Sequence, residues 1–391
     1  MNSKKKNLYI MYAISYFQGL VFYGSIATVF RQSRGLTLSQ IFFIESMLML
    51  SMLLLEVPWG YFGDKFGYKK TLTLSYFFFF ISKIIFYKSN SFLYFLIAAI
   101  VSALSISGIS GSDSALIYLS AEKEESGKAF SLYASFSAAG FFTASFLSTF
   151  MIKVSLDLPV FLTIFPYGVT FFLVFFLKDV KETNKEIKIK GSIKSVLTNK
   201  EMLVFIAAIA LISESTHSIC VFLNGPKYLE IGVPIKYFGL LTAFMQIICI
   251  SSSKAYKIKD RFGYELSFKA LIALIIGCSF LLAYVKGRII TIIFIALIEG
   301  AFAIIQPLNM DIQNKSIEGE NRATILSMYA MFGNVIASFV NLSIGKASDV
   351  SLGFSFIFCG ILSIIALILI IKWSKKWREK GCKLEITISL K

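Results

Sequence analysis

The sequence predicts an all-α protein that crosses a membrane twelve times and is built from two related six-helix bundles. Three observations predict this: apolar runs about 20 residues long, basic residues gathered in alternate connections, and short motifs that recur at one fixed spacing. Apolar residues make up 56% of the 391, and the mean hydropathy is +0.73. Soluble domains usually contain about 45–50% apolar residues, so the composition excludes an ordinary soluble fold.

Twelve runs are long enough to cross a hydrocarbon core of roughly 30 Å. Lipid offers the backbone no hydrogen-bond partners, so each run must be helical. The predicted spans are 8–30, 38–59, 70–87, 91–118, 128–152, 158–177, 201–223, 236–253, 266–285, 288–308, 322–345 and 351–373. The first run is too long for a signal peptide and lacks a small-residue cleavage site, so we expect it to remain as a membrane helix.

The net charge of +16 is unevenly distributed. Seven lysines lie between Lys178 and Lys200, and the tail from Lys372 onward is basic, whereas the opposite connections carry fewer cations. This positive-inside asymmetry predicts a multi-pass protein of a bacterial-type inner membrane with both termini in the cytoplasm. It also explains the basic charge without nucleic acid, which we do not expect as a partner.

Side chains typical of soluble enzymes and metal sites are missing from the sequence. There is one histidine, no P-loop lysine and no cysteine pair at ligand spacing. Four of the five cysteines lie in apolar spans, which argues against a disulfide framework. We therefore expect no enzyme activity, no cofactor and no metal.

An internal repeat divides the chain. The pentapeptide at 64–68 recurs at 260–264, and the hexapeptide at 131–136 recurs at 327–332, both 196 residues later. The predicted domains are 1–177, an N-terminal bundle; 178–200, a cytoplasmic linker; 201–373, a C-terminal bundle; and 374–391, a basic tail. Duplicated halves place a seam at the membrane midplane, where alternating-access transporters bind cargo, so the repeat favours transport over a passive scaffold.

The segment after the second span carries a recognisable motif. Gly60-Tyr-Phe-Gly-Asp64-Lys65-Phe-Gly67-Tyr-Lys69-Lys70 resembles the signature loop between helices two and three of the major facilitator superfamily. Leu55-Glu-Val-Pro58, the stretch 110–118 and Arg322-Ala-Thr324 resemble a bacterial subgroup of predicted drug exporters. The resemblance covers the whole chain. It implies transport by alternating access, with helices one, four, seven and ten lining a central cavity.

The resemblance also implies a conformational latch. Asp64 would sit against the positive end of the eleventh helix, where a carboxylate is stabilised by about 0.3–2 kcal/mol, with Arg322 as a second partner. Gly60 and Gly67 would allow close helix approach and a tight turn. The expected latch residues are Gly60, Asp64, Lys65, Gly67, Lys69, Lys70, Asp260, Arg261 and Arg322. For the lysines, the positive-inside signal alone is an equal explanation.

The sequence departs from proton-driven drug exporters in two spans. The fifth lacks the usual Gly-Pro motif, and the fourth lacks the usual arginine. These departures leave the antiport mechanism open while the fold expectation stands.

Polar residues inside spans are candidates for substrate binding or proton coupling, because a charge there costs about 2.5–3.5 kcal/mol. They are Gln18, Glu45, Glu214, His217 and Glu299. Gln18 and Glu214 lie 196 residues apart, and Glu214 and His217 share one helix face and could exchange a proton. A hydrogen-bonded packing role for His217 is the alternative. We expect Lys83 to reach the headgroups and assign it no function.

The resulting hypothesis is proton-coupled export of small amphipathic compounds by a monomer, with protons entering through Glu214, Glu299 or both. The alternatives are a proton-coupled metabolite importer with the same fold and, from another class, a non-transporting membrane sensor or assembly partner. The lipid bilayer, a small-molecule substrate and protons are the expected partners.

Overall fold

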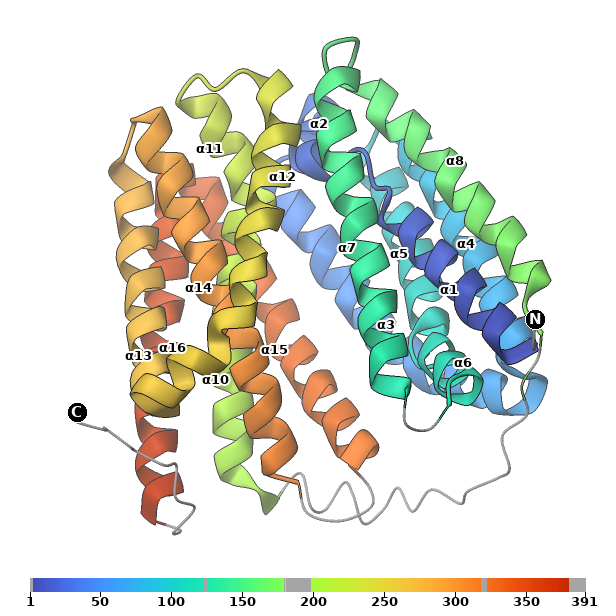
Figure 1. Ribbon diagram of the computed structural model, residues 1–391. Coiled ribbons are helices and arrows are strands. Elements are labelled where there is room, and N and C mark those ends of the chain that lie inside the picture. The colour runs from blue at the N-terminus through green and yellow to red at the C-terminus, as the bar shows by residue number, and fades with distance from the viewer. Residues whose placement is uncertain (1–2, 123–124, 179, 181–197, 318–321, 380–391) are drawn as a thin grey trace. The chain divides into compact units, whose positions relative to one another are not determined.

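The computed structural model describes residues 3–122, 125–178, 180, 198–317 and 322–379 (Figure 1). Within these ranges the regular secondary structure is entirely helical. Eleven helical segments are long and apolar enough to cross a membrane, and a shorter apolar one spans Ile235–Cys249. These twelve segments confirm the predicted all-α, twelve-helix architecture.

The helices of the first half are α1 (Ser3–Gly19), α2 (Ala27–Ser33), α3 (Leu38–Phe66), α4 (Tyr68–Lys88), α5 (Phe92–Ile109), α6 (Ser112–Ser120), α7 (Ser126–Met151) and α8 (Asp157–Leu173). Those of the second half are α10 (Lys200–His217), α11 (Asn224–Glu230), α12 (Phe238–Cys249), α13 (Ala255–Tyr284), α14 (Arg288–Lys315), α15 (Arg322–Val350) and α16 (Leu352–Glu379). Short 3-10 turns and one π turn join or extend them.

The described residues form two compact units. The first takes its residues from Met1–Lys185 and Pro234–Phe244, and the second from Glu186–Val233 and Met245–Lys391. In the first unit α1 packs against α7 and α8, while α5 packs against α3 and α4. In the second, α16 packs against α10 and α13, and α13 also packs against α14. Each unit therefore has its own helix-packed core.

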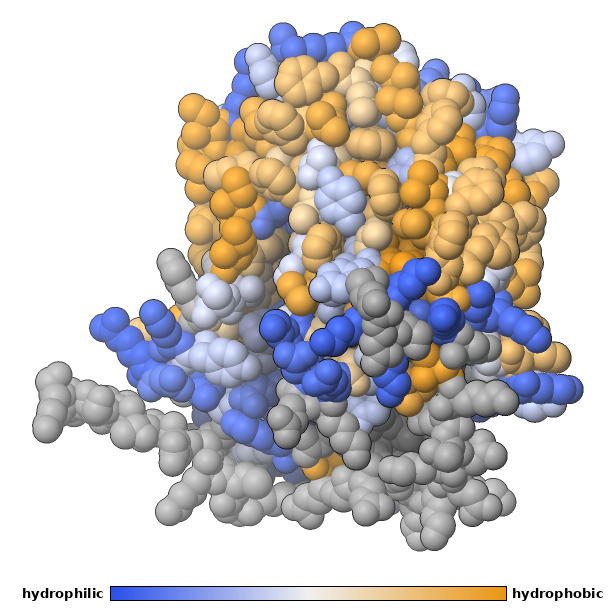
Figure 2. Space-filling view, turned by 45° about the vertical axis from the view of Figure 1, so that its right-hand side comes forward, coloured by the Kyte–Doolittle hydropathy of each residue, from blue (hydrophilic) through white to orange (hydrophobic). Residues whose placement is uncertain are grey.

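The surface is apolar where lipid would cover it. Large hydrophobic side chains such as Leu54, Phe172 and Ile289 are 75%, 65% and 74% exposed. Figure 2 shows hydrophobic residues over the middle of one face and hydrophilic residues gathered toward its upper and lower margins. Exposed apolar area on this scale is unusual in a soluble protein and expected beside hydrocarbon.

Two glycines let α1 and α7 touch through their backbones. A Cβ added to Gly19 would lie 2.3 Å from the carbonyl oxygen of Ser137, and one added to Gly140 would lie 2.2 Å from that of Tyr16. Membrane helices that lack a hydrophobic driving force between them often associate through such small residues.

The first predicted span is interrupted instead of continuous. α1 ends at Gly19, and a 3-10 turn at Gly24–Ile26 leads into α2. The backbone N–H of Phe22, freed by the interruption, donates to Thr163 Oγ1 of α8 at 3.1 Å. A neighbouring helix thus satisfies backbone that the broken helix cannot, as lipid-embedded structures require.

Two other predicted spans also change geometry within their length. The fourth divides into α5 and α6 at Gly111, which adopts a φ of 81°. The seventh passes from α10 through a π turn, Ser218–Leu223, into α11. The interruption of the first span begins two residues after Gln18, and the π turn begins four residues after Glu214, so the two repeat-related spans are irregular at corresponding places.

The start of α3 follows its sequence signature. Thr37 Oγ1 accepts from the Gln40 backbone N–H at 3.2 Å, and Gln40 Oε1 accepts from the Thr37 backbone N–H at 3.0 Å. The Thr-x-x-Gln pattern thus forms a capping box, which satisfies donors that would otherwise lack partners at the helix start.

Candidate functional site

The most deeply buried of the predicted carboxylates is Glu214, near the end of α10. It is 4% exposed, and its Oε1 lies 3.4 Å from Nδ1 of His217, one turn further along the same helix. The His217 side chain is 39% exposed, so the pair joins a buried group to a more accessible one. The structure thus brings together the two residues that sequence spacing placed on one helix face.

The chain around this pair is polar and irregular. The hydroxyls of Ser215, Thr216 and Ser218 are buried without a hydrogen-bond partner among the described residues. The π turn that begins at Ser218 widens the helix by one residue, a distortion that is frequent at functional sites. Glu214 therefore lies close in the sequence to three hydroxyl donors and to an irregular segment of backbone.

Glu299 on α14 has its own partners in the second unit. The Cys249 thiol donates to Glu299 Oε1 at 3.3 Å, and the Cys220 thiol, on the π turn, also interacts with this carboxylate. Cys220 thus connects the π turn to Glu299. The same turn begins at the residue after His217, the partner of Glu214. Sequence reasoning assigned the cysteines no role, because nothing in their spacing shows which carboxylate they face.

Gln18 and Glu45 lie in the first unit. Gln18 is half-buried beside the interruption of the first span, and its backbone carbonyl accepts from the Tyr167 hydroxyl at 3.1 Å. Glu45, on α3, is half-buried, and its negative charge acts on Arg31 of α2. Of the five predicted residues, two thus belong to the first unit and three, Glu214, His217 and Glu299, to the second.

The expectation for Lys83 was wrong. This lysine is only 9% exposed, and its ammonium donates to the Tyr23 hydroxyl at 3.1 Å instead of reaching headgroups. Its position near the end of a span suggested snorkelling, but the ammonium lies against the ring of Phe79 on its own helix and that of Tyr167 on α8. Tyr23 lies in the interruption of the first span, and no local sequence pattern predicts that interruption.

The signature loop proves to be largely helical. α3 continues to Phe66, so Gly60, Asp64 and Lys65 lie on its last turns and only Gly67 forms the turn into α4. Gly67 adopts φ 90° and ψ 154°, and nothing described lies within 4 Å of a Cβ added to Gly60. The turn therefore needs glycine at one of the two positions, and Gly60 stands in open space instead of at a helix contact.

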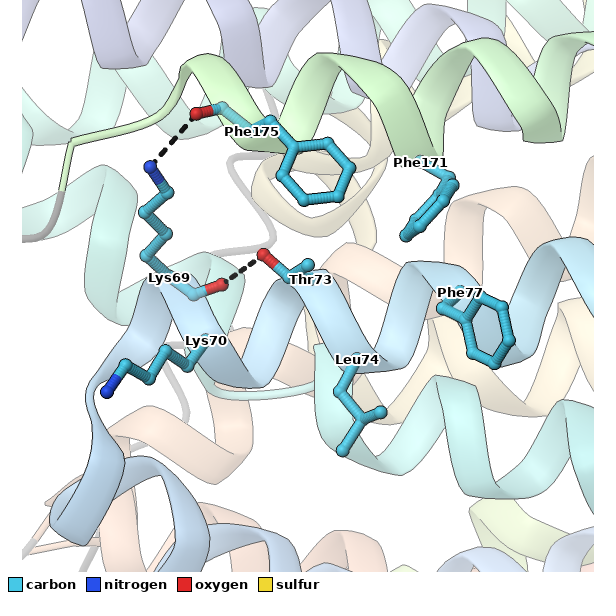
Figure 3. A pocket seen from close by; sticks show the side chains of 7 residues that line it. All are labelled: Lys69, Lys70, Thr73, Leu74, Phe77, Phe171 and Phe175. Carbon is cyan, nitrogen blue, oxygen red and sulfur yellow. Dashed lines mark hydrogen bonds between the residues drawn. The ribbon is translucent and has the colours of Figure 1, made fainter.

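The lysines of this segment line a surface groove. Lys69 Nζ donates to the carbonyl oxygen of Phe175 at 2.9 Å, at the end of the sixth span (Figure 3). The groove has a volume of ≈590 Å³ and is lined by Lys69, Lys70, Thr73, Leu74, Phe77, Phe171 and Phe175. Asp64 and Lys65 are exposed, and the Lys65 ammonium lies over the Tyr61 ring.

In the repeated motif of the second unit, charged side chains also contact residues close to them in the sequence. Asp260 pairs with its neighbour Lys259 at 3.1 Å, and the Arg261 guanidinium lies over the Phe262 ring at 5.3 Å. The side chain of Arg322 lies outside the described residues. The proposed partner of Asp64 at the start of α15 therefore stays a prediction.

These observations define a class of protein. Twelve apolar helical segments, two units, and irregular repeat-related spans beside buried polar groups are the features of a polytopic membrane transporter. The model of the Major Facilitator Superfamily matches residues 8–341, and the chain belongs to this superfamily. It is accordingly a transporter and not an enzyme.

Solved structures share the fold at low sequence identity. The nucleoside transporter NupG aligns with a TM-score of 0.76 and 14% identity over 96% of this chain and 100% of that chain. A D-xylose-proton symporter gives 0.73 and 14%, over 95% and 97%. A bacterial homologue of the human lysosomal transporter Spinster, inward-facing and unoccupied, gives 0.77 and 11%, over 97% and 98%. No curated protein matches the chain.

Proposed function

We propose that the chain is a secondary active transporter that exports small amphipathic compounds in exchange for protons, by alternating access. The observation that carries this proposal is the Glu214 carboxylate, 4% exposed within a membrane-spanning helix and paired with His217 at 3.4 Å. A charge at such a place is costly, so a proton that neutralises the carboxylate changes the energy of the site.

Proton coupling needs a group whose protonation alters a conformational equilibrium. Glu214 lies about one helical turn before the π turn, and Glu299 contacts that turn through Cys220. Protonating either carboxylate would change its interaction with a residue of this region, His217 directly before the turn or Cys220 within it. The turn is thus the element through which we expect a proton to bias one state of the transporter over another.

Export is the preferred direction because the spans are rich in apolar and aromatic residues, which suit an amphipathic cargo. A second candidate is proton-coupled import of a polar metabolite. Two solved structures with this fold are a nucleoside transporter and a D-xylose-proton symporter, and their names favour this second candidate. Fold alone does not select a cargo, so both directions enter the test.

The remaining parts of the proposal concern setting and gating. The chain acts as a monomer in a bacterial-type inner membrane with both termini in the cytoplasm. Asp64 binds the positive end of α15 in the outward-facing state and leaves it when the cytoplasmic side opens. Positive-inside charge and the signature motif support these assignments.

The test is proton movement in proteoliposomes that contain a pH-sensitive dye. Amphipathic compounds and polar metabolites are added in turn to the unaltered chain, to Glu214→Gln and to Glu299→Gln. Glu122→Gln is the control, since Glu122 is an exposed carboxylate outside the spans. Flux triggered by an amphipathic compound and lost in either span variant, but kept in the control, supports the exporter.

Two results would go against the exporter. Flux triggered only by polar metabolites would place the importer first. No flux with any compound, from protein that elutes as a folded monomer, would overturn proton coupling.

A further inference from the structure

A small cavity in the first unit is lined by two cations, Arg31 and Lys83, that the proposed proton pathway does not use. Its volume is ≈130 Å³, and it lies among α2, α3, α4, α5 and the interruption of the first span. Residues from these segments that line it include Tyr23, Arg31, Ser82, Lys83, Phe86 and Phe95.

Lys83 supplies the first cation. Its ammonium lies 4.6 Å from the ring centroids of both Phe79 and Tyr167 and donates to the Tyr23 hydroxyl at 3.1 Å. Aromatic faces stabilise a cation, and more so when water is excluded. Within the described part of the unit, this ammonium forms no ion pair with a carboxylate.

Arg31 supplies the second cation. Its Nε and Nη1 are buried and have no hydrogen-bond partner among the described residues. The guanidinium lies over the Phe86 ring at 5.3 Å, so one face is covered while these donors are unused. Buried polar groups are nearly always hydrogen-bonded, and an orphaned guanidinium donor in a cavity wall needs an explanation.

The charges around the cavity do not balance. Arg31 and Lys83 are close enough to repel each other, and Glu45 is the acidic residue whose charge acts on Arg31. Among the residues that the structure describes, one carboxylate against two cations leaves the cavity positive. A bound anion would accept from the unused donors of Arg31 and would relieve the repulsion between the cations.

Most of the remaining wall is apolar, the exceptions being Tyr23, Ser82 and Ser102. Phe86, Phe95 and Ala99 line the cavity beside the cations, and the rings of Phe86 and Phe95 meet edge to face at 5.2 Å between centroids. Its volume of ≈130 Å³ is close to, and slightly below, that of a cavity of about 150 Å³ that holds benzene. The volume therefore limits the ligand to a small anion whose apolar tail is a short chain or one ring.

We propose that this cavity binds a small organic carboxylate, its anionic group between Arg31 and Lys83 and its apolar tail against Phe86 and Phe95. The anion is the head group of a transported amphipathic compound, and this part of the inference rests on the proposed transport function. The binding itself does not require transport and is measured separately.

The first experiment measures binding to the purified full chain in detergent. Benzoate is titrated while thermal unfolding is followed, and benzamide serves as the neutral analogue of the same shape. Benzoate is expected to raise the unfolding temperature in a saturable way, and benzamide is not. This comparison needs no variant, so it decides the question even where a substitution impairs folding.

Variants then locate the site. Arg31→Gln and Lys83→Met are each expected to weaken benzoate binding at least tenfold, because each removes one of the two cations. Lys88→Gln is the matched control. It removes a positive charge from α4, the helix that carries Lys83, at an exposed position outside the cavity. Ala99→Leu changes no charge but fills the cavity, and it is expected to abolish binding.

Several results would overturn the proposal. Equal binding by the unaltered chain, Arg31→Gln and Lys83→Met would exclude this site, and benzamide binding as tightly as benzoate would exclude an anion. Inorganic phosphate that competes as well as benzoate would overturn the role of the apolar wall.

Flux measurements separate this inference from the proposed function. Benzoate binding that depends on Arg31, together with benzoate-driven proton flux lost in Glu214→Gln, supports both. Binding without flux of any compound would leave the site standing and overturn its assignment to cargo. Proton flux driven by another compound without benzoate binding would overturn the site and leave the transporter.

Discussion

Gly67 and Gly263 occupy the same place in the two halves, 196 residues apart, and both adopt a backbone conformation that favours glycine. Their φ angles are 90° and 72°, and their ψ angles are 154° and 168°. In each unit this residue marks the sharp change of direction after the Asp-Lys/Arg-Phe sequence. The repeat found in the sequence is therefore a repeat of backbone geometry, and it yields a direct test.

Replacing Gly67 by alanine should destabilise the protein. A residue with a Cβ at these angles is strained by about 1–3 kcal/mol. Gly60→Ala is the control from the same motif, because Gly60 is helical and has open space where the Cβ would go. Alanine there should stabilise the helix by roughly 0.5–1 kcal/mol. Thermal unfolding in detergent measures both, and a Gly67→Ala variant as stable as Gly60→Ala would contradict the backbone assignment.

The contact between α1 and α7 should not tolerate a single added methyl group. Gly140→Ala places a Cβ 2.2 Å from the Tyr16 carbonyl oxygen, so the helices must separate. Overpacking of this kind costs about 1–3 kcal/mol. Gly277→Ala on α13 is the control, since nothing described lies within 4 Å of its Cβ position. Similar unfolding temperatures for the two variants would show that the helices are not in backbone contact.

Thr163 should contribute more to the stability of the protein than Thr170, which lies two turns further along α8. Thr163→Val removes the acceptor of the Phe22 N–H and leaves that buried donor unsatisfied, at a cost of about 1–3 kcal/mol. Thr170→Val is matched in burial, yet Thr170 bonds only to Pro166 of its own helix. The difference in unfolding temperature between the two variants isolates the contact with the interrupted span. Equal losses would contradict that contact.

The thiol beside Glu299 should influence proton flux. Cys249→Ala removes the hydrogen bond to Glu299 Oε1, and a loss of about 0.5–1.5 kcal/mol corresponds to a change of roughly two- to twelvefold in rate. Cys278→Ala on α13 changes a buried thiol elsewhere in the same unit and should leave the flux unchanged. The dye-loaded proteoliposomes described above give both rates, and unchanged flux in Cys249→Ala would remove Cys249 from the coupling site.

Much of the fold was predictable because lipid imposes length and periodicity on each span. The twelve segments, the Thr37 capping box and the relation of Gly67 to Gly263 all follow from local sequence. The adjacency of Glu214 and His217 was predictable for the same reason, since helical spacing alone brings them together.

Contacts between distant spans were not predictable in this way. The interruption after Gly19 depends on an acceptor from α8, and the burial of Lys83 depends on rings from α8 and the first span. Arg31 directly follows the predicted first span, 8–30, and a residue at a span end looks accessible to solvent when only the sequence is considered. A single sequence gives no signal for such long-range partners, so the cavity they form became visible only in the structure.

The interrupted first span also has a consequence for biosynthesis. Phe22 finds its acceptor on Thr163, 141 residues later, and Asn7 exchanges hydrogen bonds of 2.9 Å with the backbone of Lys178. When the ribosome has delivered the first span to the membrane, neither partner has been made. The segment must therefore wait in another conformation, either as a continuous helix or beside water at the insertion machinery, until the sixth span arrives. Nascent chains that stop before Thr163 should hold the first span in a form that the finished protein does not contain.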